Sequence, residues 1–142
     1  IESITVGHTE NPQISKMTFV VNVEDEQKLE QLLKQLQKQV DVLKVNDITE
    51  KQIVVRELAL VKVASPPTVR AEVNSIIEPF RASIIDTGKN VVTFQVTGSP
   101  EKIDAFIDLL KPYGIKELTR TGVTAFVRET QKVNGPQLSI LK

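Results

Sequence analysis

The chain of 142 residues is 40% hydrophobic and 25% charged, which provides apolar material for one sizeable core or two small ones. Lys plus Arg balance Asp plus Glu at 18 each, so no basic field exists to collect phosphates, and nucleic acid is not expected as a partner. The absence of cysteine excludes disulfides, thiolate nucleophiles and cysteine-based metal sites, and nothing in the composition suggests disorder or a membrane span.

Two strands and a helix are predicted in the first third of the chain. Residues 3–6 and 17–23 are rich in β-branched side chains and flank a polar loop at residues 7–14. The helix after them has leucines at i, i+3, i+4 and i+7 and acidic residues at its start, where the helix dipole favours negative charge. These residues are Leu29, Leu32, Leu33, Leu36, Glu24, Asp25 and Glu26. Val40, Val42 and Val45 predict a further strand, and the polar run at residues 48–53 predicts a domain boundary.

The second half opens with an apolar run at residues 58–63 that predicts a buried strand. Ser65-Pro66-Pro67 then predicts a helix start, with a serine N-cap and prolines in the first turn. Pro79 has no N–H and clashes with the preceding turn, so this helix is expected to kink or end near Ile77.

The remaining elements follow from turn chemistry and periodicity. Residues 83–86 and 91–97 predict a hairpin around Gly88, a residue type that tolerates positive φ. Ser99-Pro100 caps a helix with an apolar stripe, which Gly114 ends. Residues 115–118 and 123–127 predict two strands with a bend at Thr121-Gly122, and residues 129–142 predict a frayed polar tail.

The two halves repeat one unit. Met17-Thr18-Phe19-Val20-Val21 matches Val92-Thr93-Phe94-Gln95-Val96, and the apolar quartet of the next helix falls in the same place in both. The second copy has the order strand, helix, strand, strand, helix, strand of a ferredoxin-like unit, whereas the first lacks its opening strand and helix. We therefore predict an α+β protein with a partial unit at residues 1–47, a linker at 48–53, a complete ferredoxin-like unit at 54–128 and a tail at 129–142.

The opening strand that the first copy lacks matters for its sheet. The first strand of a ferredoxin-like sheet lies between the third and the fourth, so its removal is expected to split the sheet and leave backbone groups unpaired. The chain also starts with Ile1 instead of Met and shows no leader sequence. We expect roughly 25 to 30 further residues upstream, and no ordinary monomeric fold of the first unit without them.

Few side chains show a pattern typical of catalysis. His8 is the only histidine, so a catalytic triad or a multi-histidine metal site has too few members. Asp104 and Asp108 lie one helical turn apart, which is typical of a solvated helix face and not of an acid–base pair. The loop at residues 7–14 is longer than a turn requires, so it is either a partner contact or a solvated hairpin loop.

The order of residues at the start of the chain is distinctive. Ile1-Glu2-Ser3, Thr5-Val6-Gly7, Thr9-Glu10-Asn11-Pro12 and Ser15-Lys16-Met17-Thr18 resemble the signature of the small, regulatory subunits of acetolactate (acetohydroxyacid) synthase, inside an amino-acid-binding ACT domain. The resemblance extends to about residue 128. Further matching segments are Gln35-Leu36, Val40-Asp41-Val42, Lys44-Val45, Arg56-Glu57-Leu58-Ala59-Leu60, Lys62-Val63, Arg81-Ala82, Val96-Thr97-Gly98, Lys102-Ile103-Asp104-Ala105-Phe106 and Arg120-Thr121-Gly122.

This resemblance implies a regulatory subunit with no active site and no cofactor of its own. It implies a homodimer that binds the catalytic large subunit, which uses thiamine diphosphate, FAD and Mg to condense pyruvate. The small subunit raises that activity and makes it sensitive to valine or another branched-chain amino acid. The implied location is the bacterial cytoplasm or a plastid stroma.

The resemblance also suggests which residues bind. In the family the effector lies between two ACT domains, held by the turn after the first strand and by an Asn-Ile pair at the start of the second. Ile1 matches the second member of that pair, so Ile1, Glu2 and Ser3 are the expected effector-binding residues. For contact with the catalytic subunit we select four residues of the polar loop, His8, Thr9, Glu10 and Asn11.

Two other classes of function stay open. A free-standing ferredoxin-like amino-acid sensor would bind its amino acid without an enzyme partner. An acylphosphatase would need a first loop that cradles an anion, and the prolines of Ser65-Pro66-Pro67 remove the N–H donors for it.

Overall fold

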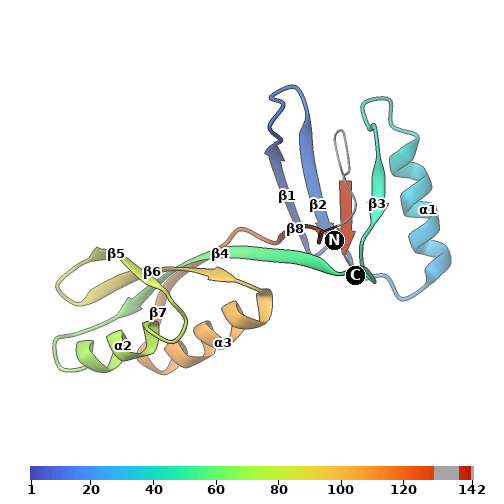
Figure 1. The fold of residues 1–142 in the computed structure, drawn as a ribbon. Helices are drawn as coiled ribbons and strands as arrows, with labels where there is room; N and C mark the ends of the chain where they lie inside the picture. Colours follow the sequence, from blue (N-terminus) through green and yellow to red (C-terminus); the bar gives the residue numbers. More distant parts are fainter. Residues whose placement is uncertain (130–137, 142) are drawn as a thin grey trace. The chain divides into compact units, whose positions relative to one another are not determined.

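The computed structural model describes residues 1–129 and 138–141 (Figure 1). The chain forms two compact units. Unit 1 combines Ile1–Val55 with Gly122–Lys142, and unit 2, Arg56–Thr121, is inserted between these two segments of sequence. No helix among the described residues is both long and apolar enough to cross a membrane.

Unit 2 has the complete ferredoxin-like order that the sequence predicts. It is built from most of β4 (Ile53–Ala64), α2 (Arg70–Ile77), β5 (Ser83–Thr87), β6 (Val91–Gly98), α3 (Pro100–Leu110), a 3₁₀ turn (Lys111–Tyr113) and β7 (Ile115–Arg120). The strands form an antiparallel sheet in the order β5-β6-β4-β7, and both helices cover one face (Figure 1). The predicted fold class is therefore confirmed for this unit.

The core of unit 2 follows from alternation in its strands. Phe94 and the other inward residues of β4 and β6 are buried, while their neighbours are more exposed. Phe106 from α3 is fully buried and packs edge-on against Phe80 and Phe94, with ring centroids 5.2 and 6.2 Å away. Ser99 caps α3 as predicted, since its hydroxyl accepts a hydrogen bond from the Lys102 N–H.

Two local predictions in unit 2 are wrong in detail. The helix α2 begins at Arg70 and not at Ser65, because Val69 is its N-cap and residues 67–69 form a turn before it. The Gly88 hairpin forms, but φ of Gly88 is not positive. A Cβ at Gly88 would instead lie 2.9 Å from Cγ2 of Val91, so close packing and not backbone conformation favours glycine there.

Unit 1 contains β1 (Ser3–His8), β2 (Ser15–Val20), α1 (Glu26–Gln37), β3 (Val45–Asp47), β8 (Thr124–Val127) and β9 (Leu138–Leu141). The helix forms where predicted, with the Asp25 carboxylate as its N-cap. Its leucine stripe packs on one face of the sheet, against Phe19, Val21 and Val45. The strand predicted from Val40 to Val45 is wrong in position: β3 starts at Val45, and Val40 lies in a turn with 95% of its surface exposed.

The expected split of the unit 1 sheet does not occur. The strand order is β1-β2-β9-β3, so β9 fills the position between β2 and β3. It runs parallel to both neighbours, with Ser139 opposite Thr18 on one side and opposite Asn46 on the other. The prediction of a frayed tail is therefore wrong for residues 138–141, while residues 130–137 and 142 lie outside the described part of the chain.

Candidate functional site

The hairpin of β1 and β2, together with the two residues before it, contains all seven residues for which the sequence predicts binding. Ser3 pairs with Val20 at one end of the hairpin, and His8 pairs with Ser15 at the other. Five residue steps of about 3.3 Å separate these ends, or roughly 17 Å. The predicted effector residues and the predicted contact loop thus lie at opposite ends of one hairpin.

The effector end of the hairpin is accessible. Ile1 keeps 77% of its surface exposed, and Glu2 is exposed while its N–H donates to the Val20 carbonyl oxygen at 2.7 Å. Ser3 is half-buried because Gly122 lies against it. A Cβ built on Gly122 would stand 3.1 Å from the Ser3 Cβ.

Gly122 also has a backbone conformation that favours glycine, with φ at +83°. Replacing Gly122 with alanine is expected to lower the free energy of unfolding by about 1–2 kcal/mol, because an L side chain is strained there and crowds Ser3. Urea denaturation measures the loss. Gly7→Ala is the matched control, since Gly7 has no positive φ and a Cβ there meets no atom within 4 Å, so its effect should stay below about 1 kcal/mol. Equal effects of the two substitutions would contradict this account.

The contact loop is held in shape by its own hydrogen bonds. The Thr9 N–H donates to the Ile14 carbonyl at 2.8 Å, and the Thr9 hydroxyl donates to the Asn11 carbonyl at 3.1 Å. The Asn11 side-chain oxygen accepts from the Gln13 N–H at 3.0 Å, which forms an Asx turn. His8, Glu10 and Asn11 are exposed around this frame, so the loop presents polar groups in one fixed arrangement.

Strand β8 crosses the face of the sheet opposite α1, and we call residues 122–127 the strap. The Thr5 hydroxyl donates to the Val123 carbonyl at 2.8 Å, and the Lys16 ammonium donates to the Ala125 carbonyl at 2.6 Å. Val123 and Ala125 of the strap are buried. Sequence reasoning did not find this contact, because its partners are 118 and 109 residues apart along the chain.

Lys16 stands out electrostatically. Its ammonium nitrogen lies 5.4 Å from the centre of the Phe126 ring, within cation–π range, and Phe126 is 58% exposed. Partial burial lowers the pKa of Lys16, because desolvation disfavours the charged form. Among the described residues it forms no ion pair that would offset this cost.

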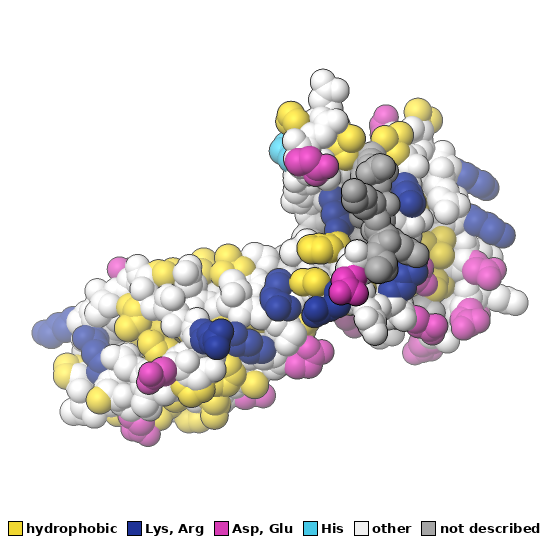
Figure 2. Space-filling view, viewed as in Figure 1, with side chains coloured by type: hydrophobic (Ala, Val, Ile, Leu, Met, Phe, Trp, Pro, Cys, Tyr) yellow, Lys and Arg dark blue, Asp and Glu magenta, His cyan; other side chains and the backbone are white. Residues whose placement is uncertain are grey.

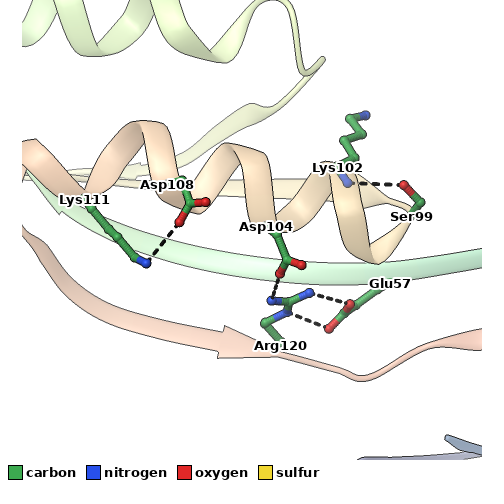
Figure 3. Close-up of polar contacts among 7 residues, drawn as sticks. All are labelled: Glu57, Ser99, Lys102, Asp104, Asp108, Lys111 and Arg120. Carbon is green, nitrogen blue, oxygen red and sulfur yellow. Dashed lines mark hydrogen bonds and ion pairs between the residues drawn. The ribbon is translucent and has the colours of Figure 1, made fainter.

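In unit 2 the two aspartates of α3 bind different cations (Figure 3). Asp108 pairs with Lys111, and Asp104 pairs with Arg120. Arg120 also forms two hydrogen bonds, at 2.9 and 3.0 Å, with the Glu57 carboxylate, whose side chain is only 5% exposed. These bonds, above all those to Glu57, raise the pKa of Arg120 above its usual value. We call Glu57, Arg120 and Asp104 the ion cluster, and its geometry is that of a structural clamp.

The described residues form neither a metal centre nor, on the face drawn in Figure 2, a surface dominated by one sign of charge. Within residues 1–129 and 138–141, no group of three or more His, Cys, Asp or Glu side chains is placed to hold a metal ion. On the face drawn in Figure 2, basic and acidic side chains are interspersed over both units, so neither sign dominates this surface.

Comparison with known proteins gives one consistent family. A family profile described as "Small subunit of acetolactate synthase" matches residues 56–129, and one described as "AHAS small subunit-like ACT domain" matches residues 1–44. The Bacillus subtilis acetolactate synthase small subunit is 63% identical over 132 residues, which cover 93% of this chain and 77% of that protein. A probable acetolactate synthase small subunit of Archaeoglobus fulgidus is 47% identical over 132 residues, 93% of this chain and 82% of that protein. The crystal structure of the acetolactate synthase small subunit from Thermotoga maritima superposes with a TM-score of 0.78 and 36% identity, covering 92% of this chain and 81% of that one.

Proposed function

This chain belongs to the family of acetolactate synthase small subunits, which are regulatory subunits, and we propose how it acts. It activates the catalytic large subunit and confers feedback inhibition by valine or another branched-chain amino acid. The observation that carries the proposal is the family match over both units, residues 1–44 and 56–129. The subunit then has no active site of its own, and thiamine diphosphate, FAD and Mg act on the catalytic partner.

The arrangement of the β1–β2 hairpin supports separate roles for its two ends. The loop with His8, Thr9, Glu10 and Asn11 is proposed to contact the catalytic subunit, because it is exposed and already ordered by its own hydrogen bonds. A preordered loop loses less conformational entropy on binding than a flexible one.

The other end, with Ile1, Glu2 and Ser3, is proposed to bind the effector within a homodimer. β1 is an edge strand of the unit 1 sheet, and its residues Ile4 and Val6 are 45% and 61% exposed. An edge strand with exposed apolar residues favours pairing with a second copy. Regulation then requires the effector to favour one arrangement of the assembly, since equal affinity for both arrangements shifts nothing. The cytoplasm, where acetolactate synthesis takes place in bacteria, is the proposed location.

Reconstitution with the catalytic large subunit tests the proposal. We expect the purified chain to form no acetolactate alone and to raise the rate of the large subunit up to a saturating ratio. When the complex is titrated with valine, leucine and isoleucine, we expect one of the three to lower its rate of acetolactate formation. Absence of any stimulation would refute the proposed role, and amino-acid binding without stimulation would favour the free-standing sensor.

A further inference from the structure

Lys16 has hydrogen-bonding capacity that its contacts with the described residues of unit 1 do not use. An ammonium group has three N–H donors, and the Ala125 carbonyl accounts for one of them. The Phe126 ring provides a second, weaker contact, and no carboxylate among the described residues pairs with Lys16. A half-buried ammonium of this kind can donate its remaining hydrogen bonds to an anionic group from outside the unit.

Among the residues that the structure describes, none fills the space beside Lys16 on its Gly7 side. Gly7 lies directly opposite Lys16 in the β1–β2 register, so a side chain at either position projects from the same face of the sheet. A Cβ at Gly7 would meet no atom within 4 Å, so the strap does not extend over this position. Lys16, the exposed Phe126 ring and the unfilled position at Gly7 together form a small platform, which we call the Lys16 platform.

The platform adjoins the contact loop and not the effector end. Gly7 and Lys16 are one residue from His8 and Ser15, where the loop begins and ends. Val20, which pairs with Ser3, lies four residues further along β2, or roughly 13 Å away.

We propose that the Lys16 platform binds an acidic side chain of the catalytic subunit, its carboxylate on the Lys16 ammonium and its apolar part against the Phe126 ring. This inference rests on the proposed function and extends the contact loop into a continuous interface. The positive charge of Lys16 selects a carboxylate, and the Phe126 ring contacts the apolar part of the same side chain. The missing side chain at Gly7 leaves room for this acidic side chain.

The test measures how much of this chain gives half-maximal stimulation of the large subunit, at low and at physiological ionic strength. Lys16→Met removes the charge at nearly constant length and is expected to raise that concentration by about tenfold or more. The salt dependence of binding should become shallower, because a screened ion pair is lost. Lys28→Met, on the exposed face of α1, is the matched control and should stay within about twofold.

A second pair of variants separates docking from the contact between Lys16 and the strap. Gly7→Asp leaves Lys16 in place but supplies a carboxylate beside it, and should weaken stimulation to a similar degree by competing for the ammonium. Gly7→Asn has nearly the same size without the charge, so Gly7→Asp should weaken stimulation more than Gly7→Asn does. The platform is refuted if Lys16→Met binds the large subunit normally. It is also refuted if Lys16→Met binds the large subunit weakly while Gly7→Asp binds it normally, because Lys16 then only positions the strap. A change in valine affinity without a change in stimulation would likewise overturn it, whereas failure of the unaltered chain to stimulate refutes the proposed function itself.

Discussion

Replacing Arg120 with methionine is expected to lower the free energy of unfolding of unit 2 by roughly 3 kcal/mol. The substitution leaves the Glu57 carboxylate, with 5% of its side chain exposed, without the guanidinium that binds both of its oxygens. An unpaired buried charge is costly because the protein interior solvates it poorly. We place the effect at the lower end of the range for broken buried pairs, since Arg120 is 30% exposed. Urea denaturation followed by circular dichroism measures it.

Two variants test whether the buried charge is the cause. Asp104→Asn removes the other partner of Arg120, but the Asp104 side chain is 61% exposed, so a loss below about 1 kcal/mol is expected. The double variant Glu57→Met, Arg120→Met replaces both charges by apolar groups and should recover most of the loss. If the double variant is as unstable as Arg120→Met alone, packing and not charge explains the effect.

Replacing Ser139 with proline is expected to destabilise unit 1 by roughly 3 kcal/mol while unit 2 remains folded. Ser139 lies in the middle of β9, which has hydrogen-bonded neighbours on both sides, and proline is not tolerated in central strands because it lacks the N–H. Hydrogen exchange should show loss of protection in β2 and β3 and unchanged protection in β6.

Ser139→Ala is the control for this prediction, because it removes only the buried hydroxyl and keeps the backbone donor. It should preserve most of the protection in β2 and β3. Unchanged exchange in the proline variant would show that β9 contributes nothing to the sheet in solution.

Most of unit 2 is predictable from the sequence because its signals are local. The apolar stripe with Ile103 and Phe106, the Ser99-Pro100 cap and the turn at Gly88 each lie within a few residues of the element they define. The sequence pattern of β2 recurs in β6, and one order of strands and helices has to fit both copies. This requirement predicts the topology of unit 2.

The predictions that failed concern contacts between distant segments. The valines before β3 look like a strand, but Val40 is 95% exposed and lies in a turn. The short β9 carries no strand signal strong enough to distinguish it from a polar tail, and its partners come from the opposite end of the sequence. The ion cluster escaped notice for the same reason, because Glu57 and Arg120 are 63 residues apart.

The candidate site likewise combines residues that the sequence predicts with contacts between distant segments that only the structure shows. Sequence resemblance selects the residues of the hairpin, and the structure shows Glu10 and Asn11 exposed on an ordered loop. The role of Lys16 depends on the strap, which packs against the hairpin only in three dimensions. The binding roles of Ile1, Glu2 and Ser3 stay predictions for the effector titration.

The insertion of unit 2 into unit 1 has a consequence for the order of folding. Unit 2 is continuous in sequence, and its two ends are joined when Leu58 and Thr121 exchange hydrogen bonds of 3.0 and 3.1 Å. Once unit 2 has folded, the segments before and after it no longer have to close a long flexible loop, which saves them an entropy cost on the order of 4 kcal/mol. The strap then meets the β1–β2 hairpin at a high effective concentration, so we expect unit 2 to fold first and the strap to join the hairpin of unit 1 afterwards.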